Sequence, residues 1–256
     1  MLTLYPNPKI NLGLRVVSRR DDGYHNIETI MYPLLHTDRL DRLDIERSDR
    51  FAFTQSGIAV DCDEEHNLVV RAYRLLEHDY SLPPVHIHLD KHIPFGAGLG
   101  GGSADAAFTL KAVNTLFDLR LTDTQLALYA LRLGADCPFF IYNTPCLVTG
   151  IGDKLEPLSI DLSDYDIRLD KPATGVSTAE AYRGITPKTH TTPLTTLIQQ
   201  PVEQWAQTIT NDFETTVFAL HPEIRAIKER MYNDGAAFAL MSGSGSSVFG
   251  LFKKNS

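Results

Sequence analysis

Apolar and polar residues alternate in two stretches of the first half of the chain, residues 9–16 and 85–91. The apolar positions are Ile10, Leu12, Leu14 and Val16 in the first stretch and Val85, Ile87 and Leu89 in the second. Successive side chains of a strand point to opposite faces, so each stretch is expected to be a strand with one apolar face. In the first strand, Lys9 and Asn11 would then share the opposite, polar face.

Other patterns predict the elements around these strands. Short apolar runs indicate strands at residues 40–46, 51–55 and 147–150, and a turn is expected at residues 20–25. Asn67 is placed to cap a helix, Thr122 and Gln125 form a capping box for a second helix, and Gly134 is expected to end it. After Asp136, the apolar residues 137–140 are expected to form a strand.

The C-terminal part of the chain shows the same mixture of helix and strand signals. Residues 187–201 are rich in Thr, Pro and His and are expected to form a surface loop with a short helix, followed by a helix that contains Trp205. Pro222 is expected to open a further helix that Gly235 ends. Apolar runs on both sides of a Gly-Ser-Gly segment at residues 243–245 indicate a hairpin.

A glycine-rich stretch, residues 94–107, connects the strand at 85–91 to a helix with apolar residues at helical spacing. Glycines at a helix N-terminus let backbone N–H groups converge on one point, and the helix dipole favours an anion there. A flexible linker is the alternative, but linkers rarely separate a patterned strand from a patterned helix. The stretch lacks the Gly-Lys-Ser/Thr ending of a Walker loop, so it predicts a phosphate site of another kind.

The sequence Pro94-Phe95-Gly96-Ala97-Gly98-Leu99-Gly100-Gly101-Gly102-Ser103-Ala104 resembles the phosphate loop of the GHMP small-molecule kinases. In one respect it departs from them, because Ala104 stands where many members carry a second Ser. The resemblance implies that the loop binds the phosphates of ATP, with Mg²⁺ bridging them and no metal-ligating residue assigned in the chain. The cofactor-binding residues it implies are Pro94, Gly96, Gly98, Leu99, Gly100, Gly101, Gly102, Ser103 and Ala104.

Two more segments resemble the catalytic motifs of this family. On residue type alone, Lys9 could be a solvated residue of an edge strand, and Asp136 could brace a turn. The segments Lys9-Ile10-Asn11-Leu12 and Gly134-Ala135-Asp136 are similar to the family's N-terminal and Gly-Ala-Asp motifs. The resemblance therefore implies that Lys9 and Asp136 are catalytic, with Asp136 accepting or orienting the proton of the substrate hydroxyl.

A third group of segments implies the substrate. Asp22-Gly23-Tyr24-His25 resembles a signature of the branch that phosphorylates the 2-hydroxyl of a cytidine-diphosphate-linked methylerythritol in the non-mevalonate isoprenoid route. In that branch, aromatic residues matching Tyr24 and Tyr182 flank the cytosine, and a residue matching His25 binds the edge of the base. The substrate-binding residues implied are Asn11, Tyr24, His25, Thr178, Tyr182, Gly243 and Ser244.

The resemblance also implies the architecture. We expect an α+β protein of two domains, residues 1–152 similar to the second domain of ribosomal protein S5 and residues 153–256 ferredoxin-like, with the active site between them. The chain ends shortly after its last predicted strand, where many members continue with a further helix and strand, so the sequence leaves the completeness of the second domain open.

Composition narrows the range of partners. The 256 residues include 24 Lys and Arg and 32 Asp and Glu, a formal charge of −8 that is spread along the chain. Nucleic-acid binding would require a basic face, so small-molecule partners are expected. No apolar run approaches the roughly 20 residues of a membrane span. We therefore expect a cytoplasmic protein that does not act at a membrane, either a monomer or a homodimer.

The cysteines are consistent with this interpretation. Cys62, Cys137 and Cys146 are odd in number and lack metal-ligand spacing, so we expect small buried apolar residues in a reducing compartment. Two other functions stay open from the sequence. One is a different GHMP kinase, of the homoserine or mevalonate type, and the other is a non-catalytic nucleotide- or RNA-binding module with an S5-like fold.

Overall fold

The structure is a computed structural model that describes residues 1–59 and 62–254. Its contacts divide the chain into two compact units, neither of which is continuous in sequence. The first unit comprises Met1–Lys9, Pro33–Phe95 and Gly100–Thr144, and the second comprises Ile10–Tyr32, Gly96–Leu99 and Pro145–Ser256. The predicted boundary near residue 152 would divide the chain into two continuous segments. Because each unit of the structure is assembled from three segments, the units do not test this boundary, and it stays a prediction.

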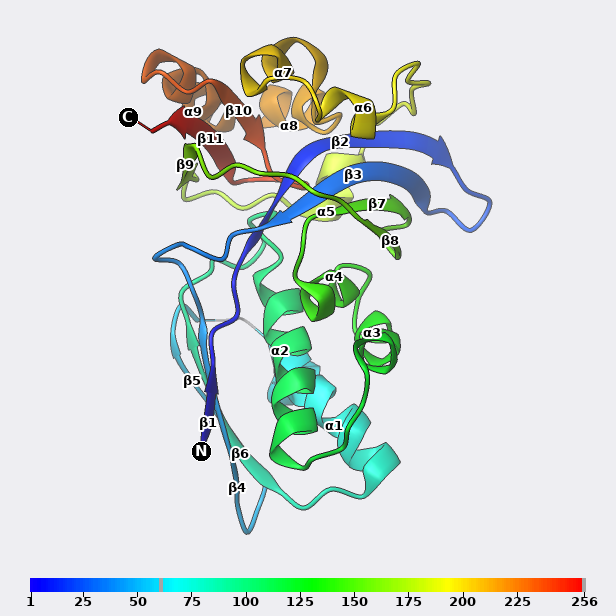
Figure 1. Cartoon of the computed structure of the whole chain (residues 1–256), viewed down its shortest axis with the longest axis vertical. Helices are drawn as coiled ribbons and strands as arrows, with labels where there is room; N and C mark the ends of the chain where they lie inside the picture. Colours follow the sequence, from blue (N-terminus) through cyan, green and yellow to red (C-terminus); the bar gives the residue numbers. More distant parts are fainter. Residues whose placement is uncertain (60–61, 255–256) are drawn as a thin grey trace. The chain divides into compact units, whose positions relative to one another are not determined.

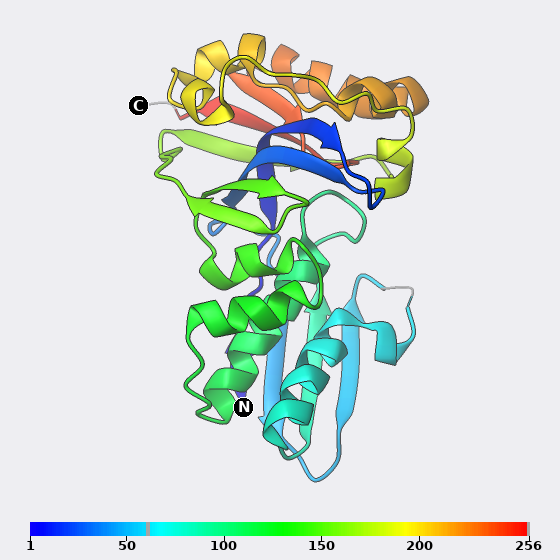
Figure 2. The ribbon, with the colours of Figure 1, turned by 90° about the vertical axis from the view of Figure 1, so that its right-hand side faces the viewer.

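In the first unit, helices cover one face of a sheet (Figures 1 and 2). The strands, in spatial order, are β1 (Leu2–Leu4), β4 (Arg42–Arg47), β6 (Val85–Lys91) and β5 (Ala52–Gly57), with only the β5–β6 pair parallel among the described residues. Helices α1 (Leu68–Tyr80) and α2 (Gly101–Leu116) contact each other, and α2 contacts β1 and β4. The predicted alternation of β6 is confirmed, because Val85, Ile87 and Leu89 are buried beneath these helices.

Local signals position the helices of the first unit. The Asn67 side chain accepts a 2.9 Å hydrogen bond from Val69 N at the start of α1, which follows the short 3₁₀ helix η1 (Glu64–His66). The capping box of Thr122 and Gln125 opens α3 (Asp123–Leu131), as predicted. This helix ends at Leu131 with Arg132 as its C-cap residue, so Gly134 lies one position beyond the place where a terminating glycine is expected, and its amide still donates to Ala130 O at 3.2 Å.

One predicted element of the first unit is wrong. The apolar residues after Asp136 form the helix α4 (Cys137–Tyr142) instead of a strand. Pro138 lies in the first turn of this helix, where its fixed φ and missing N–H are tolerated. A short apolar run fits a buried strand and a buried helix equally well, so its pattern could not decide between them.

The second unit contains two sheets and a layer of helices. One sheet has the order β2 (Lys9–Arg19), β3 (His25–Pro33), β7 (Cys146–Gly150) and β8 (Lys154–Pro157), and the other has the order β10 (Phe238–Met241), β11 (Val248–Lys253) and β9 (Tyr165–Asp170). The helices are α5 (Thr178–Tyr182), α6 (Leu194–Leu197), α7 (Val202–Thr208), α8 (Glu214–Leu220) and α9 (Pro222–Asn233). Helix α9 packs on β10 and β11, and α7 packs on β10 (Figure 1).

Apolar packing holds this second unit together and confirms several sequence predictions. Ile224, Ile227 and Met231 of α9 join Leu14 and Val16 of β2 in one buried cluster. The predicted end of α9 is confirmed, because Gly235 follows the C-cap residue Asp234 in a left-handed backbone conformation with φ of +93°. The hairpin predicted around the Gly-Ser-Gly segment is also present, as β10 pairs with β11 in antiparallel register.

Burial excludes the solvated-edge alternative for Lys9 and corrects one expectation about the cysteines. Every residue of β2 from Lys9 to Val16 is buried, so the polar face of this strand is packed within protein instead of facing solvent. Of the cysteines, Cys137 and Cys146 are buried as predicted, whereas Cys62 is exposed, because it lies in the polar loop that leads to η1. Among the described helices, none has both the length and the apolar content needed to cross a bilayer.

Candidate active site

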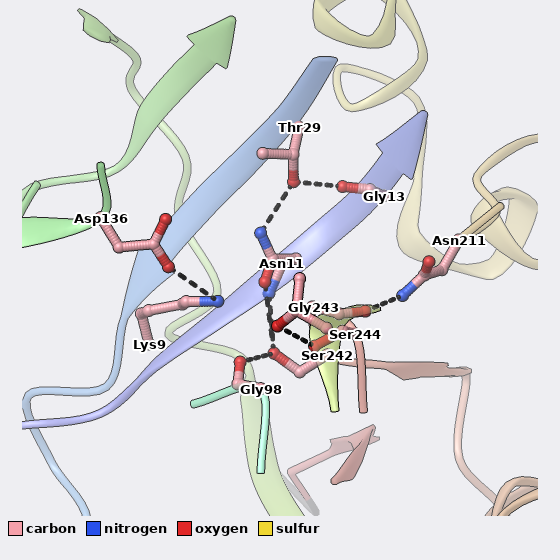
Figure 3. Close-up of polar contacts among 11 residues, drawn as sticks. Lys9, Asn11, Gly13, Thr29, Gly98, Asp136, Asn211, Ser242, Gly243 and Ser244 are labelled. Atoms are coloured by element: carbon pink, nitrogen blue, oxygen red, sulfur yellow. Dashed lines mark hydrogen bonds and ion pairs between the residues drawn. The ribbon is translucent and has the colours of Figure 1, made fainter. Parts of the chain in front are cut away.

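The first unit brings Lys9 and Asp136 together, although 127 positions separate them in the sequence (Figure 3). Lys9 begins β2, and Asp136 lies at the N-cap position of α4. The Lys9 Nζ atom is 3.9 Å from Asp136 Oδ2, with the lysine side chain 4% exposed and the aspartate side chain 38% exposed. Burial lowers the pKa of Lys9, and the charge of Asp136 opposes this shift. A desolvated ammonium therefore lies beside a carboxylate that remains accessible.

The N-terminus of α2 lies next to this pair within the first unit. Gly100 caps the helix in a left-handed conformation with φ of +70°. A Cβ at Gly100 would lie 2.9 Å from the Phe140 ring and 3.3 Å from Lys9 Cε, so only glycine lets the backbone approach the lysine this closely. First-turn amides have no acceptor within a helix, so those of Gly101, Gly102 and Ser103 are available to an anion.

A cavity of about 150 Å³ opens beside the same helix turn. A Cβ at Gly102 would make ordinary contacts there, 3.6 Å from Leu68 Cδ1 and 3.9 Å from Phe95 Cε2. The residues that line the cavity are Cys62, His66, Asn67, Leu68, Leu89, Lys91, Phe95, Gly102 and Asp105. The sequence patterns did not predict this cavity, although an aromatic residue within the glycine loop was a signal for it: Phe95 is 67% exposed.

The other half of the glycine loop belongs to the second unit. There, Gly98 O accepts a 2.9 Å hydrogen bond from Ser242 Oγ, and Ala97 O accepts one of 3.1 Å from Ser247 N. A Cβ at Gly98 would lie 2.0 Å from Ser242 O, so this glycine is required by its contact with the β10–β11 turn. Ala104, at the other end of the loop, is fully buried and its amide donates to Gly100 O. Contacts of Gly98 and Ala104 with ATP stay predictions.

Amide and hydroxyl groups support the β10–β11 turn (Figure 3). Asn11 Nδ2 donates to Thr29 Oγ1 at 2.9 Å, and Asn11 N donates to Ser242 Oγ at 3.3 Å. Asn211, which lies just before α8, donates from Nδ2 to Gly243 O at 2.8 Å. Asn11 thus connects β2, β3 and the turn within the second unit, while its predicted contact with substrate stays a prediction. The supporting role of Asn211 was not found from the sequence.

The aromatic residues predicted to contact the base also lie in the second unit. The rings of His25 and Tyr182 are stacked, with centroids 4.9 Å apart and planes inclined by 22°, and Tyr182 contacts Phe213 edge-on. Tyr24, next to His25, is 63% exposed. Thr178 Oγ1 lies 3.3 Å from Ser244 Oγ. The structure therefore brings together two pairs of predicted substrate residues, His25 with Tyr182 and Thr178 with Ser244.

Known proteins share this combination of fold and motifs. Residues 67–144 match the GHMP kinases N terminal domain, and residues 195–256 match the GHMP kinases C terminal model. A crystal structure of 4-(cytidine 5'-diphospho)-2C-methyl-D-erythritol kinase is similar with a TM-score of 0.82 and 34% identity, over 98% of this chain and 90% of that one. Homoserine kinase from Cytophaga hutchinsonii has a TM-score of 0.69 at 19% identity, over 100% of this chain and 88% of that one, which shows the fold alone.

The fold is therefore that of a GHMP small-molecule kinase. A 4-diphosphocytidyl-2-C-methyl-D-erythritol kinase from Parabacteroides distasonis is 54% identical over 250 residues, which are 98% of this chain and 91% of the relative. The chain belongs to the GHMP kinase family and, within it, to the 4-diphosphocytidyl-2-C-methyl-D-erythritol kinases.

Proposed function

We propose that this protein transfers the γ-phosphoryl group of ATP to the 2-hydroxyl of 4-diphosphocytidyl-2-C-methyl-D-erythritol. The observation that carries the proposal is the 54% identity, over nearly the full chain, to a relative named for this activity. The geometry of the first unit supports it, because a lysine and an accessible aspartate lie beside a glycine-capped helix N-terminus.

In this proposal Asp136 and Lys9 act on the substrate hydroxyl. Phosphoryl transfer depends mainly on positioning the reactants and stabilising charge. Asp136 Oδ2 accepts or orients the hydroxyl proton, and the Lys9 ammonium stabilises the negative charge that develops on the oxygen. The two groups are already close enough to act on one hydroxyl, because Lys9 Nζ lies 3.9 Å from Asp136 Oδ2.

The start of α2 provides the proposed ATP site. The first-turn amides of Gly101, Gly102 and Ser103 receive phosphate oxygens, and the adjacent cavity, with Leu68 and Phe95 on its wall, receives the base. Mg²⁺ would neutralise phosphate charge when bound with ATP, and among the described residues no group of three or more His, Cys, Asp or Glu side chains is placed to hold it. We assign no side chain of the chain to the metal.

Residues of the second unit would recognise the cytidine part of the substrate. His25 and Tyr182 offer one stacked aromatic pair, and the exposed Tyr24 offers a further ring surface. The His25 ring already covers one face of the Tyr182 ring. A base that stacks on Tyr182 therefore has to displace His25 or to bind the opposite face of the Tyr182 ring. The hydroxyls of Thr178 and Ser244 are a second polar group in the same unit.

An assay of ATP-dependent phosphoryl transfer tests this function. The purified protein is incubated with ATP, Mg²⁺ and one of three acceptors, the cytidylylated methylerythritol, mevalonate or homoserine, and the product is identified by mass spectrometry. We expect a phosphorylated product from the cytidylylated acceptor and none from the other two. Phosphorylation of mevalonate or homoserine in preference to it would overturn the substrate assignment, and nucleotide binding without any transfer would favour a binding module.

A further inference from the structure

Behind the glycine loop, the first unit contains a buried cluster of three charged side chains, Asp41, Lys91 and Asp105, which are 0%, 1% and 4% exposed. Lys91 Nζ donates to Asp41 Oδ2 and lies 2.8 Å from Asp105 Oδ2. Lys91 ends β6, which leads into the glycine loop, and Asp105 lies near the start of α2, which leaves it. The cluster therefore ties the two ends of the loop together.

The two carboxylates of this cluster have different surroundings. Asp41 accepts hydrogen bonds from Lys91 and from two backbone amides, His92 N at 2.5 Å and Ile93 N at 2.7 Å. Asp105 Oδ2 contacts Lys91, but Asp105 Oδ1 is buried and has no hydrogen-bond partner among the described residues. Asp41 therefore has three donors for its two carboxylate oxygens, whereas Asp105 has only Lys91 among the described residues.

A single ammonium cannot balance two buried carboxylates. With both aspartates ionised, the cluster would carry a net negative charge in a medium of low dielectric constant, which is strongly unfavourable. The proton that removes this charge goes to the carboxylate with fewer donors. We propose that Asp105 is held as the neutral carboxylic acid and acts as a positioning residue, so that the glycine loop lies over a cluster without net charge.

The electrostatics of the site agree with this assignment. Burial raises the pKa of Asp105 to about 8; Lys91 opposes the shift, and the neighbouring Asp41 adds to it. Two close carboxyl groups that share one proton are a known means of keeping one of them neutral.

The cluster lies directly beneath the first turn of α2. A Cβ at Gly101 would be 2.9 Å from Lys91 Nζ and 2.8 Å from Ile93 Cγ2. Ionisation of Asp105 would place a negative charge under the amides that, in the proposed function on which this step rests, bind the phosphates of ATP. ATP affinity should therefore fall as the pH rises through the pKa of Asp105.

Other titratable groups face the same region, so the experiment has to distinguish their effect on ATP binding from the effect of Asp105. Cys62 and His66 line the cavity beside Lys91 and Asp105, and Lys9 approaches the loop at Gly100. The Cys62→Ser background removes the thiol from the wall of the cavity. Adding Asp105→Asn to this background and comparing the two proteins leaves the other titratable groups of the region unchanged between them.

The first measurement needs no nucleotide. In the infrared difference spectrum between the Cys62→Ser protein and its Asp105→Asn variant at pH 7, we expect the C=O band of a protonated carboxylic acid. This band should disappear with a midpoint near pH 8 as Asp105 ionises. Absence of the band at pH 7 would overturn the proposal. If the Asp105→Asn variant does not fold, the same titration on the parent protein, with loss of the band near pH 8, replaces the difference spectrum.

The second measurement connects protonation to binding. Calorimetric titration with a non-hydrolysable ATP analogue is carried out between pH 7 and 9.5, where we expect the Kd of the parent to rise above pH 8 by at most about tenfold per pH unit. The Asp105→Asn variant, always neutral, should lack this rise, and Asp90→Asn, on the solvent side of β6, should keep it. Parallel curves for parent and Asp105→Asn would overturn the proposal. If the carboxylic acid band of Asp105 were present at pH 7 but the ATP analogue did not bind, the proposed ATP site would be refuted and the protonation of Asp105 would stand.

Discussion

Among the described residues of the first unit, two lysine–aspartate groups have very different surroundings, the Lys9–Asp136 pair and the Asp41–Lys91–Asp105 cluster. In the pair, the charged atoms are 3.9 Å apart and the aspartate side chain is 38% exposed. In the cluster, no side chain is more than 4% exposed and the lysine donates directly to Asp41. Both groups contact the glycine loop, the pair at Gly100 and the cluster at Gly101.

This difference separates a chemical role from a positioning role. A carboxylate that is partly exposed and held loosely can exchange its lysine contact for a substrate hydroxyl at little cost. A buried ion pair cannot lose one partner without leaving an uncompensated charge, so it is suited to fixing the backbone around it. The pair should therefore control turnover, and the cluster should control stability and the conformation of the loop.

The largest expected effect is on turnover at the exposed pair. Asp136→Asn keeps the shape of the side chain but removes its ability to accept the hydroxyl proton. A general base contributes about 10² to 10⁴ in rate, so kcat should fall by that factor with KM values little changed. Steady-state kinetics with both substrates measure this, and Asp118→Asn, at an exposed surface ion pair, is the control. Turnover close to that of the wild type would show that Asp136 only shapes the turn before α4.

The next largest effect is on stability, and it distinguishes the buried Lys91 of the cluster from Lys9 of the pair. Lys91→Met leaves the Asp41 charge buried without its cation and should lower the free energy of unfolding by about 3 to 5 kcal/mol. Lys9→Met removes an ammonium that burial already disfavours, so it should lower kcat and leave stability nearly unchanged or increased. Urea denaturation at pH 7 measures both variants, and equal losses of stability would refute the separation of roles.

The pH dependence of stability provides an independent check on the same two groups. For Lys9 the folded pKa is lowered, so the unfolded chain binds more protons between that pKa and 10.5, and stability rises with pH across this range. For Asp105 the folded pKa is raised from 3.8 to about 8, so its contribution is present below pH 3.8 and is lost as the pH rises through 8. Lys9→Met should remove the rise in the free energy of unfolding between the lowered pKa of Lys9 and pH 10.5. Asp105→Asn should remove the loss of unfolding free energy that accompanies ionisation of Asp105.

The sequence predicted local elements well because their signals are local. Alternation located β2 and β6, and the side chains of Asn67 and Thr122 located the starts of α1 and α3. The same alternation places Lys91 on the inward face of β6 with Val85, a sign of a buried charge that was not used. Its partners could not be predicted, because Asp41 lies 50 positions away and reaches Lys91 through the pairing of β4 with β6, while Asp105 comes from helix α2.

The sequence offered candidate residues but not their arrangement in space. Family resemblance located Lys9 and Asp136, which the structure brings together, but it gave no distance or exposure for either side chain. Nor did it reveal that the glycine loop is divided between the two units, with Gly98 bonded to Ser242 and Gly100 near Lys9. These features depend on contacts between residues distant in sequence, which no local pattern records.

The smallest expected effect distinguishes two adjacent glycines on opposite sides of one helix turn. At Gly102 a Cβ would contact Leu68 and Phe95 at 3.6 and 3.9 Å, on the wall of the cavity. Gly102→Ala should therefore weaken ATP binding by about 1 kcal/mol, roughly fivefold in Kd. Because alanine is favoured over glycine within a helix, unfolding should cost about 0.5 to 1 kcal/mol more.

At Gly101 the added methyl group would point inward, where Ile93 Cγ2 and Lys91 Nζ lie 2.8 and 2.9 Å from the Cβ position. Gly101→Ala should therefore overpack the buried cluster and lower stability by about 1 to 3 kcal/mol. Thermal denaturation and nucleotide titration of the two variants measure both effects side by side. The opposite result would be a loss of stability in Gly102→Ala and a loss of ATP affinity alone in Gly101→Ala. It would mean that Gly102 faces the buried cluster and Gly101 faces the nucleotide. The cluster could then not lie beneath the ATP site.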